Sequence, residues 1–248
     1  MGEPGFAGQR QADLEVRARL VSGHFLGEDA MNPVDAGFEY FPTSFNKAEI
    51  ASLEAVLAAV PSQAAGRRWA GRGLEMLLQH PALVPVMARV AMLLPQGRAL
   101  RAVAFKKDAD ANWFVPAHQD RSIPIPSSEL PEGFSRATRK GDGWQAEAPM
   151  VVLQAMRNFR IFIDDATTDD GPLEVIPGSH RLGRIEQAAI PGIVAQSAWH
   201  PLTGHAGDVV MLSPLLLHRS VKATSPRGRR VLQIECVSCE ASELIFAG

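Results

Sequence analysis

Cysteine is scarce in this sequence. Only two of the 248 residues are cysteines, Cys236 and Cys239. Two such residues cannot build the disulfide framework that stabilises small secreted proteins. We therefore expect a reducing environment and predict that the protein is cytoplasmic.

Strong net charge and long apolar runs are also missing. The formal net charge is −2, so no basic face is expected and nucleic acid is not a predicted partner. The longest apolar candidate, residues 82–94, is interrupted by Pro85 and Arg89 and falls short of the ~20 residues of a membrane span. Residues 1–19 lack the apolar core of a secretion signal. We expect no membrane partner.

The bulk composition indicates a globular protein. Apolar residues make up 46% of the chain and charged residues 21%, which are ordinary values for a folded domain. A chain of this length buries most of its apolar surface without disulfides or structural metals. We predict a single domain over residues 1–248.

The first part of the chain, residues 1–97, is predicted to be mostly helical. Asn46 and Glu49 have the spacing of a capping box, and Pro61 is expected to end the helix that follows. The apolar positions at helical spacing are Ile50, Leu53, Val56, Leu57 and Val60.

Residues 98–240 have a different pattern, with short strand-like runs separated by turn signals. Such a pattern is typical of a sandwich or barrel, so a mainly β core with helices packed on its outer face is predicted. Residues 123–150 are rich in proline, glycine and charge and are predicted to form a long lid loop. The clearest strand candidates are residues 99–105, 153–164, 208–212, 215–220 and 230–237.

His118 and Asp120 are two residues apart in an extended run. Residues at this spacing in a strand point to the same face, so an imidazole and a carboxylate could bind one metal ion. His218 could supply a third ligand, and two histidines with one carboxylate are characteristic of non-haem Fe(II) oxygenases. The alternative is a surface histidine beside a turn aspartate, because a bare His-x-Asp pair is common.

Arg229 lies eleven residues after His218 at the start of a predicted strand. An arginine there could reach into the barrel and form a bidentate pair with a carboxylate. A buried arginine needs such an anionic partner, from the protein or from a ligand. The alternative is a surface arginine in a basic turn; strand alternation lets only one of Arg229 and Arg230 point inward.

Several blocks between Arg101 and Glu235 resemble one known family. They comprise a strand with the His-x-Asp pair, a central strand ending in Pro-Gly-Ser-His, and a closing segment with the distal histidine and an arginine. Together they resemble the phytanoyl-CoA dioxygenase family of Fe(II)- and 2-oxoglutarate-dependent oxygenases. The blocks are NWFVPAHQDR (112–121), GPLEVIPGSHR (171–181), GDVV (207–210), HRS (218–220) and RR (229–230).

The resemblance implies a double-stranded β-helix, that is, a cupin-like jelly roll, flanked by helices. It implies Fe(II) as the metal, 2-oxoglutarate and O2 as cosubstrates, and succinate and CO2 as co-products. The carboxylate of Asp120 favours hydroxylation, because related halogenases lack it. The implied metal ligands are His118, Asp120 and His218, and the implied 2-oxoglutarate contacts are Arg229, Ser220, Lys107, Asn112 and Gln119.

This sequence departs from the family pattern at three places near the site. Many members have a small residue after the distal histidine, an asparagine a few residues later, and an aromatic residue before the first histidine. Here these places hold Arg219, Ala223 and Ala117. The expected ligands are unaffected, whereas substrate preference is left open.

The substrate is expected to be a small organic molecule. Arg160, Arg121 and Trp144 are candidate substrate contacts, although Arg160 in a strand could equally face solvent. Two other functions remain open: a zinc hydrolase on a cupin-like barrel, and a ligand-binding barrel without catalysis. Neither the oligomeric state nor the chemical identity of the substrate follows from the sequence.

Overall fold

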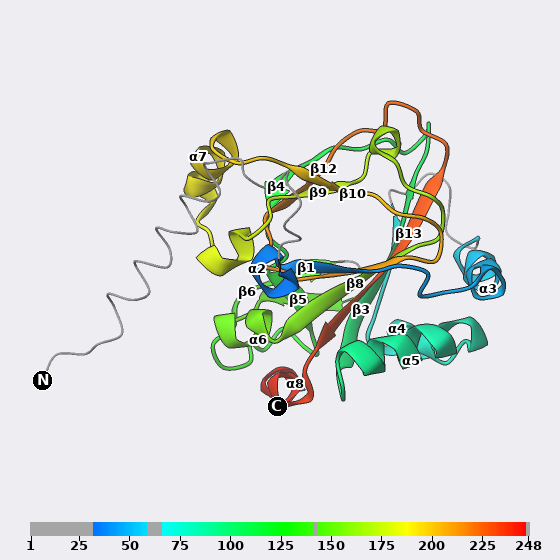
Figure 1. The fold of residues 1–248 in the computed structure, drawn as a ribbon. Helices are drawn as coiled ribbons and strands as arrows, with labels where there is room; N and C mark the ends of the chain where they lie inside the picture. Colours follow the sequence, from blue (N-terminus) through cyan, green and yellow to red (C-terminus); the bar gives the residue numbers. More distant parts are fainter. Residues whose placement is uncertain (1–31, 59–65, 141–142, 247–248) are drawn as a thin grey trace, which may run out of the picture.

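Two antiparallel sheets face each other across the interior of the molecule (Figure 1). The computed structural model describes residues 32–58, 66–140 and 143–246. The larger sheet has the strand order β1-β11-β8-β13-β3-β2, and the smaller has the order β10-β9-β12-β4. The strands of the larger sheet are β1 (Phe38–Phe41), β2 (Gly66–Ala70), β3 (Arg98–Lys107), β8 (Met156–Phe162), β11 (Val209–Leu212) and β13 (Arg229–Val237). Those of the smaller sheet are β4 (Val115–His118), β9 (Leu173–Val175), β10 (His200–Leu202) and β12 (His218–Ser220).

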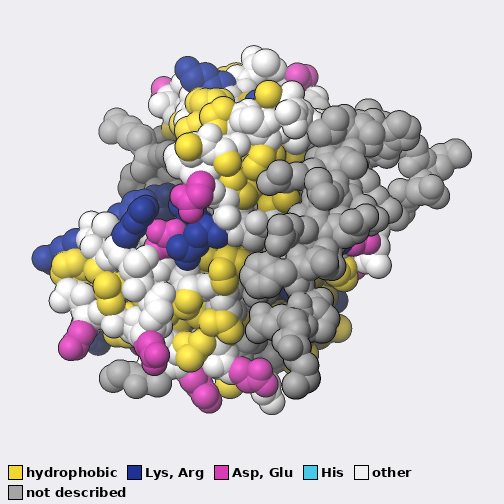
Figure 2. Space-filling model, turned by 90° about the vertical axis from the view of Figure 1, so that its left-hand side faces the viewer, with side chains coloured by type: hydrophobic (Ala, Val, Ile, Leu, Met, Phe, Trp, Pro, Cys, Tyr) yellow, Lys and Arg dark blue, Asp and Glu magenta, His cyan; other side chains and the backbone are white. Residues whose placement is uncertain are grey.

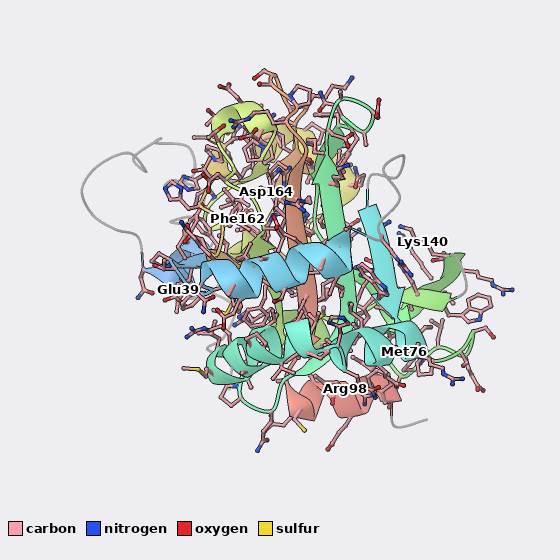
Figure 3. The ribbon with its side chains drawn as sticks, turned by 90° about the vertical axis from the view of Figure 1, so that its right-hand side faces the viewer. Glu39, Met76, Arg98, Lys140, Phe162 and Asp164 are labelled. Atoms are coloured by element: carbon pink, nitrogen blue, oxygen red, sulfur yellow. The ribbon has the colours of Figure 1, made fainter. Side chains whose placement is uncertain are left out.

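Helices cover the outer face of the larger sheet, with α3 and the α4–α5 pair lying across its strands (Figure 3). Asn46 caps α3 through the predicted capping box with Glu49, whereas Val60 and Pro61 lie outside the described residues. No single helix in the described ranges is long and apolar enough to cross a membrane, although the bent pair 71–78 and 81–93 passes the same test. The helices are α2 (Pro33–Ala36), α3 (Lys47–Leu57), α4 (Gly71–Leu78), α5 (Val84–Leu93), α6 (Met150–Gln154), α7 (Ile190–Ala195) and α8 (Cys239–Phe246). Short 3-10 helices are η1 (Pro81–Leu83), η2 (Thr168–Asp170), η3 (Ser179–Leu182) and η4 (Gln187–Ala189).

The main core lies between these helices and the larger sheet. Leu53 of α3 and Val86 of α5 pack against alternate side chains of the central strands, such as Phe159 and Ile234. Burial of each such side chain contributes about 1.5–3 kcal/mol. Because side chains alternate along a strand, the other face of these strands points into the space between the sheets.

That inner face is unusually polar for a buried sheet. Asn158 and Arg160 on β8 and Gln233 and Glu235 on β13 are all buried, yet they alternate with core residues such as Phe159. Buried polar groups are costly unless they are paired, so the region between the sheets indicates a site rather than a second apolar core.

Two segments differ from the elements that the sequence predicts. Residues 33–94 supply not only helices but also β1 and β2, the two edge strands of the larger sheet. Residues 123–150, predicted as a loop, contain a third sheet with the order β5-β7-β6. Both faces of this sheet carry polar side chains, so the alternation that reveals a strand is weak. Its strands are β5 (Ser122–Ile125), β6 (Ser135–Lys140) and β7 (Gly143–Glu147).

The surface mixes charges of both signs. On the face shown in Figure 2, a group of basic and acidic side chains lies between apolar areas. This distribution agrees with the small net charge of the sequence.

Candidate metal centre and its cavity

His118, Asp120 and His218 converge at one edge of the smaller sheet. Strands β4 and β12 are antiparallel neighbours, and His118 is directly opposite His218 in their register. The two imidazole centroids are 4.3 Å apart. The Nε2 atoms of His118 and His218 lie 3.9 and 3.7 Å from the Asp120 carboxylate. One potential ligand atom from each residue lies within 4.8 Å of the other two, which is the spacing of ligands around one ion.

Backbone carbonyls orient both imidazoles. Nδ1 of His118 lies 2.8 Å from the carbonyl oxygen of Pro116, and Nδ1 of His218 lies 2.8 Å from that of Leu216. These contacts favour a proton on Nδ1, which leaves the Nε2 lone pair free for a metal. Asn158 donates to Asp120 Oδ2 at 3.2 Å and holds that carboxylate from the larger sheet.

The charges in the centre suit metal binding. Burial alone would raise the pKa of Asp120, but His218, His118 and Arg101 outweigh it and hold that pKa below its usual value. Burial lowers the pKa of His218 despite the opposing charge of Asp120. An ionised carboxylate and neutral imidazole are the forms that bind a cation. The donor set of two imidazole nitrogens and one carboxylate oxygen, all on one side, fits Fe(II).

Arg229 lies in the same cavity as these three residues. Its side chain is buried, donates to the Gly171 carbonyl oxygen at 3.0 Å, and has an Nε atom that finds no partner in the described part of the chain. Burial lowers its pKa to about 10, and the charges of Asp170 and Asp164 oppose that shift. Arg230 points the other way and contacts Asp164 at 2.6 Å. Arg229 is therefore the inward arginine, and it suits an anionic ligand.

Lys107 and Asn112 lie behind the cavity wall rather than among the residues that line it. The Lys107 ammonium donates to Ser220 Oγ at 2.9 Å, to the Gly171 carbonyl oxygen at 3.1 Å, and to the Val221 carbonyl oxygen. Three protein acceptors use its three protons, and burial lowers its pKa to about 7.

Two other predicted 2-oxoglutarate contacts, Asn112 and Gln119, hold the backbone around the cavity. The Asn112 side chain exchanges hydrogen bonds of 2.9 and 2.8 Å with the backbone of Ala223. The Gln119 amide lines the cavity, but it donates to the carbonyl oxygens of Gly183 and Leu215 and accepts from the Ile185 amide. Both side chains thus hold backbone segments that lie around the cavity.

The three predicted substrate contacts are placed differently from one another. Arg160 lines the cavity, is 5% exposed, and donates to Gln233 at 3.1 Å. Arg121 also lines it and contacts Glu147 at 3.3 Å. Gln145 and Glu147 of β7 line the cavity. Because side chains alternate along a strand, Trp144 lies on the opposite face of β7, where it packs against an apolar cluster.

Sequence reasoning missed a buried ion pair beside the metal centre. Arg101 on β3 contacts Glu235 on β13 at 2.7 Å, and both line the cavity. Trp113, which also lines the cavity, lies over the Lys107 ammonium at 4.8 Å. The sequence did contain one signal of this pair, namely polar residues at every second position of otherwise apolar strands.

Comparison with known proteins agrees with this geometry. A family model described as phytanoyl-CoA dioxygenase matches residues 73–231. An L-proline trans-4-hydroxylase of Streptomyces griseoviridis is 34% identical over a match that covers 37% of this chain and 43% of that enzyme. The chain therefore matches less than half the length of this relative.

Solved structures show the same fold. The epimerase SnoN, in complex with Fe3+, alpha ketoglutarate and nogalamycin RO, has a TM-score of 0.57 at 15% identity, covering 91% of this chain and 85% of SnoN. The alpha ketoglutarate-dependent carbocyclase SnoK has a TM-score of 0.56 at 17% identity, covering 86% and 85%. The prediction of a jelly roll with flanking helices is confirmed.

The solved structures define the fold class as a jelly roll with flanking helices. Because the family model covers more than half of the sequence, the chain belongs to the phytanoyl-CoA dioxygenase family. This membership favours the oxygenase over the zinc hydrolase and the non-catalytic barrel.

Proposed function

We propose that this chain hydroxylates a small organic molecule with O2, converting 2-oxoglutarate to succinate and CO2. A C–H bond of the substrate becomes C–OH with one oxygen atom, and the other oxygen enters succinate. The observation that carries the proposal is that the His118, Asp120 and His218 triad shares one cavity of about 590 Å³ with Arg229. The Arg229 side chain is buried and has no carboxylate partner among the residues that the structure describes.

The three triad side chains would hold Fe(II), which supplies the activation of O2 when it is bound. Arg229 would bind the distal carboxylate of 2-oxoglutarate through its guanidinium. Ser220 Oγ accepts from Lys107, so its own proton is free to donate to that carboxylate. Asn158 would keep Asp120 oriented.

L-proline is the first candidate substrate to test, because the chain is similar to an L-proline trans-4-hydroxylase. The similarity covers less than half of that enzyme, so other small amines and acids belong in the same test.

The test is succinate formation from 2-oxoglutarate with Fe(II), followed with and without L-proline. The wild-type protein should form succinate only with both Fe(II) and O2. Asp120→Ala should bring turnover to background, whereas Asp165→Ala, which removes an exposed carboxylate, should not. Unchanged turnover in Asp120→Ala, or turnover with Zn(II) without O2, would overturn the proposal.

We also propose that the protein acts in the cytoplasm on small molecules rather than on nucleic acid or membranes. Both cysteines are free thiols, with Cys236 buried and Cys239 exposed. This supports a reducing compartment.

A further inference from the structure

The wall of the cavity carries more positive than negative charge. Seven arginine and lysine side chains line it, against three carboxylates, Asp120, Glu147 and Glu235. Asp120 belongs to the metal centre, so only two acids remain to balance the basic residues.

These two acids are already paired. Glu235 contacts Arg101 at 2.7 Å. Glu147 contacts Arg121 at 3.3 Å and two further arginines, Arg136 and Arg184, at 3.6 and 3.3 Å. Neither acid is available to the remaining cations of the wall.

Four cations therefore line the cavity without an acid partner in the described ranges: Arg160, Arg229, Arg68 and Lys140. The proposed function, on which this inference rests, assigns the distal carboxylate of 2-oxoglutarate to Arg229, and the carboxylate beside the keto group would lie at the metal centre. Neither carboxylate is left for Arg68 and Lys140.

The sheet register places Arg68 on the cavity side. Arg160 is opposite Gln233, Gln233 is opposite Val103, and Val103 is opposite Arg68, in one row across four strands. Directly opposed residues point to the same face, so Arg68 shares the inner face with Arg160. Three strand spacings of about 4.8 Å separate their backbones by roughly 14 Å, and Arg68 thus stands at the outer end of the row.

Lys140 approaches Arg68 from the third sheet. It is on β6, whose residues Arg136 and Thr138 line the same cavity wall, and Figure 3 labels it beside β2. The Arg68 guanidinium and then partial burial hold the pKa of Lys140 below its usual value. Two like charges are thus close together at the mouth, an arrangement that an anion would relieve.

We propose that Arg68 and Lys140 form an anion site at the cavity mouth that holds a carboxylate or phosphate group of the substrate. The substrate is then a small molecule that carries such an anionic group, with its reacting carbon between this site and the metal centre. Gln145 and Gln233, which also line the cavity, provide neutral hydrogen-bonding groups along the way.

Binding of sulfate to the Fe(II) enzyme, saturated with 2-oxoglutarate and kept anaerobic, tests the site by titration calorimetry. The double variant Arg68→Gln with Lys140→Gln should weaken sulfate binding by about tenfold or more. The matched control is Arg67→Gln with Arg139→Gln. It removes the same charge from the adjacent residues of the same strands, which do not line the cavity, and it should bind as the wild type does. Equal binding by both double variants, or no sulfate binding by the wild type, overturns the proposal.

A panel of small carboxylic acids, phosphate monoesters and the matching amides then identifies the anionic group. Compounds that stimulate succinate formation should carry a carboxylate or phosphate group, and their amides should not stimulate. Stimulation by amides alone overturns the anion site. Failure of the wild type to form any succinate, with sulfate binding intact, instead rejects the proposed oxygenase activity and leaves the site standing.

Discussion

At the scale of single residues, Arg229 and Arg230 show how strand alternation separates two roles. Arg230 reaches Asp164 and Glu54, each at 2.6 Å, on the outer side of the sheet. Arg229 is 4% exposed and has no carboxylate partner in the described part of the molecule. A buried, unpaired guanidinium is costly, so its presence is best explained by a ligand that supplies the carboxylate.

Replacement of Arg229 by glutamine should weaken 2-oxoglutarate binding by roughly 100-fold, because a buried charge-assisted contact of about 2–5 kcal/mol is lost. Iron binding should change little, since Arg229 is not one of the ligands. Anaerobic calorimetry measures both affinities. Arg230→Gln is the control on the neighbouring residue; an equal loss in that variant would show that Arg229 acts through stability rather than contact.

The three side chains that converge in the candidate metal centre could be predicted from the sequence, because the family blocks contain the His-x-Asp pair and the distal histidine. The roles of Lys107 and Asn112 could not. Both were expected to contact 2-oxoglutarate, and the structure has them bonded to backbone behind the wall. The hydrogen-bond acceptors of such a side chain come from loops that are far apart in the sequence. A local sequence pattern therefore does not predict them. The Arg101–Glu235 pair was missed for the same reason.

At the scale of elements, the turn after η2 holds two buried basic side chains in place. The Gly171 carbonyl oxygen accepts from both Lys107 and Arg229. Gly171 has φ +60°, and a Cβ there would meet the Ala223 amide nitrogen at 2.6 Å, so only glycine fits. Thr167 is the N-cap residue of η2, and Asp170 is its partner in a capping box. The Asp170 carboxylate also contacts Arg227 at 2.8 Å.

Asp170→Asn should lower stability at neutral pH by about 1–3 kcal/mol, the cost of weakening a buried hydrogen-bond network. Burial alone would raise the pKa of Asp170, but Arg227 and Thr167 lower it from 3.8 to about 2. A lowered carboxyl pKa stabilises the fold above about pH 4, and this stabilisation is lost as pH falls toward 2. Thermal unfolding between pH 7 and 2 should show the two proteins converging in acid; a constant difference would contradict this.

For residues 123–150, the sequence pattern did not predict the secondary structure. The sequence predicts a loop, and the structure has β5, β6 and β7. One face of the β6–β7 hairpin lines the cavity with polar side chains, while the other packs on an apolar cluster that includes Trp144. Several residues on the face away from the cavity are also polar. The alternation of polar and apolar residues that indicates a strand is therefore weak. The segment contributes Arg136, Thr138, Gln145 and Glu147 to the wall of the cavity that contains the metal centre.

At the scale of the whole molecule, the order of the family blocks was sufficient to predict the jelly roll. The sequence did not reveal β1 and β2, because four- and five-residue edge strands carry little periodicity. Strand β2 also carries Arg68, which lines the cavity and belongs to the proposed anion site. The two strands also join residues 33–94 to the larger sheet through register with β11 and β3.

We propose that the chain folds as one domain, with its helical part and its β core sharing the cluster around Leu53 and Phe159. Differential scanning calorimetry should therefore show a single transition whose calorimetric and van't Hoff enthalpies agree. Leu53→Ala, at a fully buried position, should lower the free energy of unfolding by about 2–5 kcal/mol. The whole transition should therefore move to lower temperature. Two separate transitions, with only one shifted, would indicate two independent units.

The most direct test of the account is an anaerobic crystal structure with Fe(II) and 2-oxoglutarate. We expect one iron bound by Nε2 of His118, Nε2 of His218 and the carboxylate of Asp120, with the distal carboxylate of 2-oxoglutarate on Arg229. Iron at another place, or a 2-oxoglutarate molecule that leaves Arg229 without a carboxylate, would contradict it.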